Sequence, residues 1–181
     1  RFIEPIFRQA TTIAATITTT DLRTQTAHGS VAAQGGFTMS LRIDSLSADS
    51  LRVTVPSGFT MAITSPLYSD TITLKPGYVL DSSYDGTAVP PGGTIPGRTT
   101  TTASGPVESA TAAGYVQLAT LQPLVQYDVD ANPRSGQFEA VGKTGSLQAT
   151  VLSTTQVQID LDADGNGIFD ASKVVLWSDL F

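Results

Sequence analysis

The chain has 181 residues, which is enough for one domain with a sizeable hydrophobic core. Its formal net charge of −6 and sequence pI of about 4.5 argue against a nucleic-acid partner. The chain contains no cysteine, so disulfides, thiol chemistry and cysteine zinc sites are excluded. Only 14% of the residues are charged, and threonine, serine, glycine and alanine take their place. This composition is typical of exported surface and fibre proteins.

The N-terminal segment, residues 1–20, is set apart from a single β domain predicted over residues 21–181. Ala10 to Thr20 is rich in β-branched residues and is predicted to be a strand, preceded by a short irregular or helical lead. This strand carries no charge, although edge strands are normally protected by lysine, proline or a bulge. The hypothesis is that it pairs with another copy of the chain by β-strand addition. The alternative is an ordinary first strand of a monomer.

From Gly29 to Leu80, polar and apolar residues alternate in short runs that are separated by turn-forming residues. Every second residue is apolar from Phe37 to Ile43, from Leu51 to Val55 and from Phe59 to Ile63. One apolar side per strand is typical of a sheet with one buried face. Short strands at this spacing predict an all-β fold, an antiparallel β-sandwich of the Ig-like or jelly-roll-like kind.

Residues Asp81 to Ala113 lack this alternation. They include Pro90-Pro91-Gly92-Gly93, Pro96-Gly97 and a threonine run from Thr99 to Thr102. Proline and threonine hold a chain extended rather than collapsed. We therefore expect one long irregular Gly/Pro/Thr-rich loop over residues 81–113, which either carries a binding surface or acts as a spacer.

Alternating strands return from Tyr115 onward, and two octets in this part resemble each other. Val125 to Asn132 matches Val157 to Asp164, and each octet ends in a turn. We interpret them as two related hairpins joined by a strand from Ser146 to Leu152. The first octet offers a second, weaker candidate cation site, formed by Asp128, Asp130 and Asn132.

The second octet leads into the only run of acidic residues at metal-ligand spacing. A calcium ion needs six to eight hard oxygen ligands, and short carboxylates spaced by two can wrap around it. Gly165 makes a sharp turn possible, because it has no Cβ. The predicted calcium ligands are Asp160, Asp162, Asp164, Asn166 and Asp170, with Asn166 contributing a backbone carbonyl.

This run resembles the D-x-D-x-D-G calcium loops of dockerins, type 3 thrombospondin repeats and EF-hand-like sites of secreted bacterial proteins. Counted from Asp160, the twelfth position is Ala171 rather than the glutamate of an EF-hand, and Asp170 lies two residues later than in the D-x-D-x-D-G-x-x-D pattern. The alternative is a plain β-hairpin with a solvated acidic turn, which Asn166-Gly167 alone would favour.

Catalytic constellations are scarce in the sequence, and no catalytic residue is predicted. His28 is the one histidine, no G-x-S-x-G motif accompanies it, and no apolar run reaches the length of a membrane span. The composition and the acidic loop favour a secreted or cell-surface location. The expected function is a self-associating structural or adhesive β-domain stabilised by calcium. The alternative is a carbohydrate-binding module, for which Tyr78 and Tyr84 are the candidate glycan platform.

Overall fold

The computed structural model describes residues 10–26, 29–45, 47–65, 69–111 and 114–180. This part contains twelve strands and a short 3₁₀ helix: β1 (Thr11–Thr26), β2 (Gly29–Ser45), β3 (Ala48–Val55), β4 (Phe59–Thr64), β5 (Ser69–Leu74), β6 (Tyr78–Asp85), β7 (Arg98–Ser109), β8 (Gly114–Tyr127), β9 (Ser135–Val141), β10 (Ser146–Val151), β11 (Gln156–Asp162), β12 (Ala171–Leu176) and η1 (Trp177–Asp179). The predicted all-β, antiparallel fold is confirmed. Within the described ranges, no helix has the length and apolar character needed to cross a membrane.

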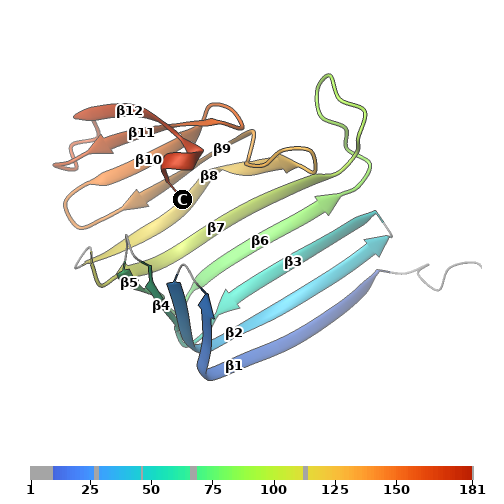
Figure 1. The fold of residues 1–181 in the computed structure, drawn as a ribbon, viewed down its shortest axis with the longest axis horizontal. Coiled ribbons are helices and arrows are strands. Elements are labelled where there is room, and N and C mark those ends of the chain that lie inside the picture. Colours follow the sequence, from blue (N-terminus) through green and yellow to red (C-terminus); the bar gives the residue numbers. More distant parts are fainter. Residues whose placement is uncertain (1–9, 27–28, 46, 66–68, 112–113, 181) are drawn as a thin grey trace, which may run out of the picture.

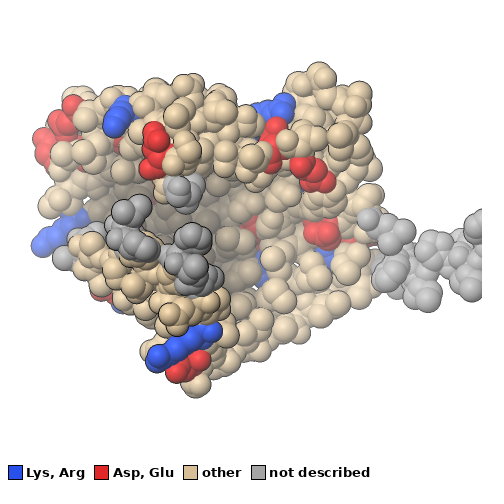
Figure 2. Space-filling model, viewed as in Figure 1, with Lys and Arg blue, Asp and Glu red and all other residues tan. Residues whose placement is uncertain are grey.

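All twelve strands belong to one hydrogen-bonded sheet (Figure 1). The sandwich prediction expected two separate sheets, and here the strands are continuous in a single one. The order is β12-β11-β10-β9-β8-β7-β5-β4-β2-β3-β6, with β1 added to β2 and a further pairing of β6 with β7. From β7 to β12 the strands follow one another as a meander. Figure 2 shows that the face in view is hollowed between the upper and lower parts of the molecule.

Between β2 and β7 the sheet divides into two ribbons. One edge of β2 pairs with β4 through Ser30–Gly35 and with β3 through Thr38–Ser45. In the same way, β7 pairs with β6 through Arg98–Ser104 and with β5 through Val107–Ser109. The ribbons β3–β6 and β4–β5 therefore diverge at one line across the sheet, and Figure 1 shows β4 and β5 turned out of the plane of the long strands.

Two glycines allow the long strands to bend at this line. Gly35 in β2 has a φ of 115° and Gly105 in β7 a φ of 125°, a region that side chains with a Cβ rarely adopt. A Cβ on Gly35 would lie 2.4 Å from the carbonyl oxygen of Gly58, and one on Gly105 would lie 2.5 Å from the Cα of Tyr78. The bend therefore requires glycine both for its backbone conformation and for the close approach of the neighbouring chain.

The irregular loop is shorter than the sequence predicted. Residues 81–85 belong to β6, and Arg98–Ser109 forms β7, so the loop between these strands covers 86–97 rather than 81–113. The threonine run from Thr99 to Thr102 lies in β7, where it pairs with Tyr84–Asp81 of β6 and, through Thr99–Thr101, with β8. Pairing on both sides, which no local apolar pattern reveals, makes this run a strand.

The N-terminal strand is confirmed, but the boundary drawn at residue 20 falls inside it. β1 extends to Thr26 and pairs with β2 along its length. Its register shifts between Thr19 and Leu22. The predicted lead over residues 1–9 lies outside the described residues.

The hydrophobic core lies in the C-terminal part of the sheet. Ala149, Val151, Val157 and Trp177 are buried together, and Phe138 and Ile159 are among the half-buried side chains packed against them. Trp177 is the largest side chain of this buried cluster. Its indole Nε1 donates to the carbonyl oxygen of Ser153 at 3.2 Å, which fixes η1 against the sheet beside the acidic hairpin.

Candidate cation site in an acidic loop

The acidic loop connects β11 to β12 at one end of the core. The last residue pair of the hairpin is Leu161 with Ala171, and the amide of Asp170 donates to the carbonyl oxygen of Leu161 at 2.8 Å. Every residue from Ala163 to Asp170 is exposed. The ladder of the hairpin therefore holds both ends of a loop whose interior can be reached from solvent.

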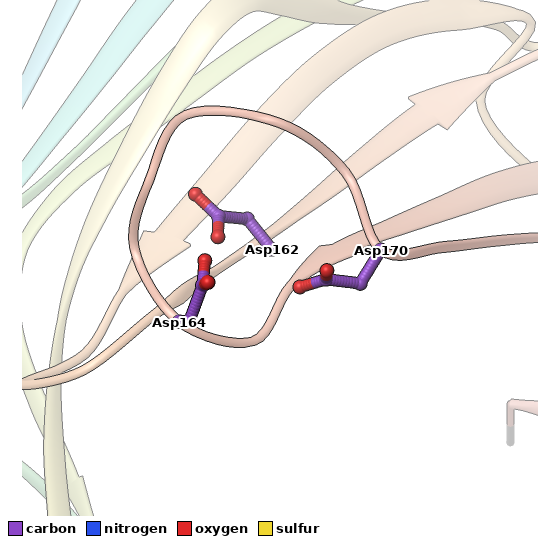
Figure 3. Close-up of side chains that lie close together, drawn as sticks. All are labelled: Asp162, Asp164 and Asp170. Carbon is purple, nitrogen blue, oxygen red and sulfur yellow. The ribbon is translucent and has the colours of Figure 1, made fainter.

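Three carboxylates meet in this loop. Asp162, Asp164 and Asp170 each offer one oxygen, and these oxygens lie within 4.8 Å of one another. Ligands at 2.3–2.6 Å from a common cation are at most about 5 Å apart, so this spacing fits a calcium ion. Figure 3 shows the carboxylates of Asp162 and Asp164 close together, with Asp170 pointing toward them from the other end of the loop.

Asp162 is the buried member of the cluster, with 3% of its surface exposed. Its Oδ2 accepts the amide of Gly167 at 2.9 Å and its Oδ1 accepts the amide of Gly165 at 2.7 Å. These backbone amides, that of Gly167 most strongly, lower the pKa of the Asp162 carboxyl. A carboxylate has about four lone-pair sites, so two remain for a cation.

The three carboxylates that meet would fit a calcium loop counted from Asp162, two residues later than the sequence indicated. Counted from Asp162, positions 1, 3, 5 and 9 of a calcium loop are Asp162, Asp164, Asn166 and Asp170, and position 7 offers the carbonyl of Ile168. Position 6 is then Gly167, where an EF-hand requires glycine for its sharp turn, and its φ is 83°. The predicted turn residue, Gly165, is position 4. The sequence feature that could have indicated this numbering is Asn166-Gly167, because it places a glycine at position 6.

Asp160, which was also among the predicted ligands, does not lie in this cluster of carboxylates. It lies inside β11, opposite Gln148 of β10 and Ser172 of β12. Both of its carboxylate oxygens accept the side-chain amide of Gln158 at 2.9 Å. At Asp160, β11 is paired with a strand on each side, whereas its pairing with β12 has ended by Asp162, where the loop follows.

Asn166 was expected to offer its backbone carbonyl, and the structure shows its side chain in use within the loop. Its Oδ1 accepts the amide of Ile168 at 2.8 Å, and its Nδ2 donates to Oδ2 of Asp164 at 3.0 Å. The amide of Ala163 donates to Oδ2 of Asp170 at 2.7 Å. These bonds hold Asp164 and Asp170 in place at opposite ends of the loop.

The structure does not assemble the second candidate cation site. Asp130 accepts two hydrogen bonds from the Arg134 guanidinium, at 3.0 and 2.7 Å, and this pairing lowers the pKa of its carboxyl. Asp128 accepts the hydroxyl of Tyr84, and Asn132 donates its side-chain amide to the carbonyl of Thr154, both at 3.0 Å. The three side chains thus face different partners.

The two candidate platform tyrosines do not form one surface. Tyr78 and Tyr84 stand at opposite ends of β6, about 20 Å apart at the usual rise of a strand. Burial raises the pKa of Tyr78, and the bond to Asp128 raises that of Tyr84. Both tyrosines are half-buried, so each ring presents only part of its surface to solvent.

Comparison with protein-family models, with curated proteins and with solved structures finds no match for this chain. Any function proposed for it therefore rests on its own residues and geometry.

Proposed function

We propose that this chain is a non-enzymatic structural or adhesive β-domain of a secreted or cell-surface protein, which works by associating with other copies of itself. The observation that carries the proposal is the open edge of the sheet. Among the described strands, β1 pairs with β2 alone, so backbone donors and acceptors of its outer edge face away from the sheet. Ile13 and Leu22 on this strand are 54% and 58% exposed.

The proposal is tested with the intact chain. Sedimentation velocity over a concentration series, with electron microscopy of the same samples, should show species larger than the monomer that grow with concentration. A chain that remains monomeric at the highest concentrations, with and without calcium, would contradict the proposal.

Calcium in the acidic loop is the second part of the proposal. Asp162, Asp164 and Asp170 would supply carboxylate oxygens, with Asn166 and the carbonyl of Ile168 at the intervening positions. By tying both ends of the loop together, the ion would stabilise the hairpin that borders the core. The support is the convergence of the three carboxylates and the position of Gly167.

Thermal unfolding tests the calcium site separately. Extracellular sites bind with a Kd of about 10⁻⁴–10⁻³ M, so about 10 mM calcium should raise the Tm by about 3–10 °C. Asp164→Asn should remove this increase, because it takes away one carboxylate of the cluster. Asp128→Asn is the matched control and should keep the increase. An unchanged Tm of the native chain in calcium and in chelator would show that the loop is a plain hairpin turn.

A further inference from the structure

The first part of β1, Thr11–Thr19, carries none of the charges or prolines that normally prevent edge-to-edge pairing. No charge and no proline lie between Ala10 and Thr20, and every described residue from Thr11 to Thr18 is exposed. The strand at the other end of the sheet differs, since β12 has six residues and carries the exposed Lys173 among them. Of these two edge strands, β1 is the one suited to pairing with another strand.

The regular part of β1 ends before its charged residues. From Thr11 to Thr19 its pairing with β2 runs without interruption, and the register shift follows between Thr19 and Leu22. Asp21 and Arg23 lie at and beyond this irregularity and pair with each other, Nε to Oδ1, at 2.6 Å. A straight and uncharged edge is therefore confined to Thr11–Thr19.

This stretch is nearly symmetric about its central residue, Ala15. If two copies run antiparallel with Ala15 opposite Ala15, the facing pairs are Thr11 with Thr19, Thr12 with Thr18, Ile13 with Ile17 and Ala14 with Thr16. Identical residue types therefore face each other in every pair except Ala14 with Thr16. Moving the centre by one residue in either direction places both isoleucines opposite alanine or threonine.

We propose that two copies of this chain pair through β1, antiparallel, about a two-fold axis that is perpendicular to the sheet and passes midway between the two facing Ala15 residues. This inference rests on the proposed self-association and specifies its contact. A two-fold axis of this direction keeps Ile13 and Ile17 of both copies on one face, where they form cross-strand apolar pairs, and the threonines pair beside them. Backbone groups of the two edges then pair with each other between Thr12 and Thr18, and the sheet continues from one chain into the next.

Single cysteines test the register, because the chain has no cysteine of its own. In Ala15→Cys the two sulfurs would face each other across the axis, with Cα atoms about 4.5–5.5 Å apart, a separation that a disulfide can span. Under mild oxidation this variant should form a covalent dimer within the time in which a control remains monomeric. The control is Thr11→Cys, whose two copies would lie about 27 Å apart.

A mixture of variants gives the complementary result. Thr11→Cys and Thr19→Cys, each unable to cross-link with itself, should form a mixed disulfide dimer when combined, because Thr11 of one copy faces Thr19 of the other. Circular dichroism of each variant, compared with the native chain, checks that the sheet has formed before oxidation.

The outcomes separate this inference from the proposed function. If the native chain associates but Ala15→Cys cross-links no faster than Thr11→Cys, the two-fold contact is wrong while self-association stands. If the native chain is monomeric at every concentration and no variant cross-links, both are wrong. Selective cross-linking of Ala15→Cys and of the Thr11→Cys and Thr19→Cys mixture would establish the contact.

Discussion

The line of divergence between the two ribbons can be tested by adding one methyl group to β2. Gly35→Ala would place a Cβ 2.4 Å from the carbonyl oxygen of Gly58 and 2.9 Å from the Cα of Phe59, both of them backbone atoms that cannot rotate away. It would also force alanine into a φ of 115°. Gly77→Ala is the matched control, since its φ is 93° but no atom lies within 4 Å of the added Cβ.

The expected magnitudes follow from these two situations. Alanine at a positive φ costs about 1–2 kcal/mol, and the reduced freedom of the unfolded chain offsets about 0.4–1 kcal/mol of this. Gly77→Ala should therefore lower the free energy of unfolding by about 1 kcal/mol. Overpacking against the backbone adds about 1–3 kcal/mol, so Gly35→Ala should lower it by about 2–4 kcal/mol.

Thermal unfolding followed by circular dichroism measures the difference. For a domain of this size, the Tm should fall by about 2–4 °C in Gly77→Ala and by about 5–15 °C in Gly35→Ala. Equal decreases in the two variants would refute the close approach of β2 and the Gly58 turn. They would leave only the backbone conformation as the reason for glycine at the bend.

Two further predictions concern the core and the acidic groups. Val157 is 1% exposed, so Val157→Ala should lower the free energy of unfolding, measured by urea titration, by about 2–3 kcal/mol. The control is Val174→Ala, at a site 47% exposed, which should change this free energy by about 0.5 kcal/mol or less. Similar losses in the two variants would place Val157 outside the core. Asp130 and Asp162 have pKa values lowered below 3.8, by Arg134 and by the amide of Gly167 respectively. The two carboxylates therefore stabilise the fold fully at pH values above the ordinary pKa range of carboxyl groups, and this stabilisation is lost as the pH falls through their lowered pKa values. The free energy of unfolding should decline from about pH 5 downward, and it should decline less steeply in Asp162→Asn. An equally steep acid decline in that variant would show that Asp162 does not contribute.

Local sequence determined most of the strands. Alternation of apolar and polar residues depends only on neighbours along the chain, and it placed strands over Phe37–Ile43, Leu51–Val55 and Phe59–Ile63, which the structure confirms. It also identified the β-branched N-terminal strand. In each case one face of the strand is less polar than the other, and that difference is written in the residues themselves.

Pairing with neighbouring strands determined the secondary structure where apolar and polar residues do not alternate. The run Thr99–Thr102 has no apolar face, yet it forms part of β7 because β6 and β8 satisfy its backbone on both sides. The same kind of information fixes the single bent sheet: the contacts that require Gly35 and Gly105 come from Gly58 and Tyr78, which are distant in sequence.

The two similar octets, Val125–Asn132 and Val157–Asp164, show most directly what the sequence alone could not predict. Both place aspartates at the same spacing, but Arg134 occupies the carboxylate of Asp130, whereas Asp162 meets only backbone amides and two further carboxylates. The set of carboxylates that meet likewise depends on where β11 ends, since Asp160 pairs with both neighbouring strands and Asp162 is the last residue of β11, paired with β10 alone. The sequence alone determined which side chains could bind a cation. The end of a strand and the partners across it decided which of them meet, because a carboxylate already paired or held in a ladder is not free to turn toward an ion.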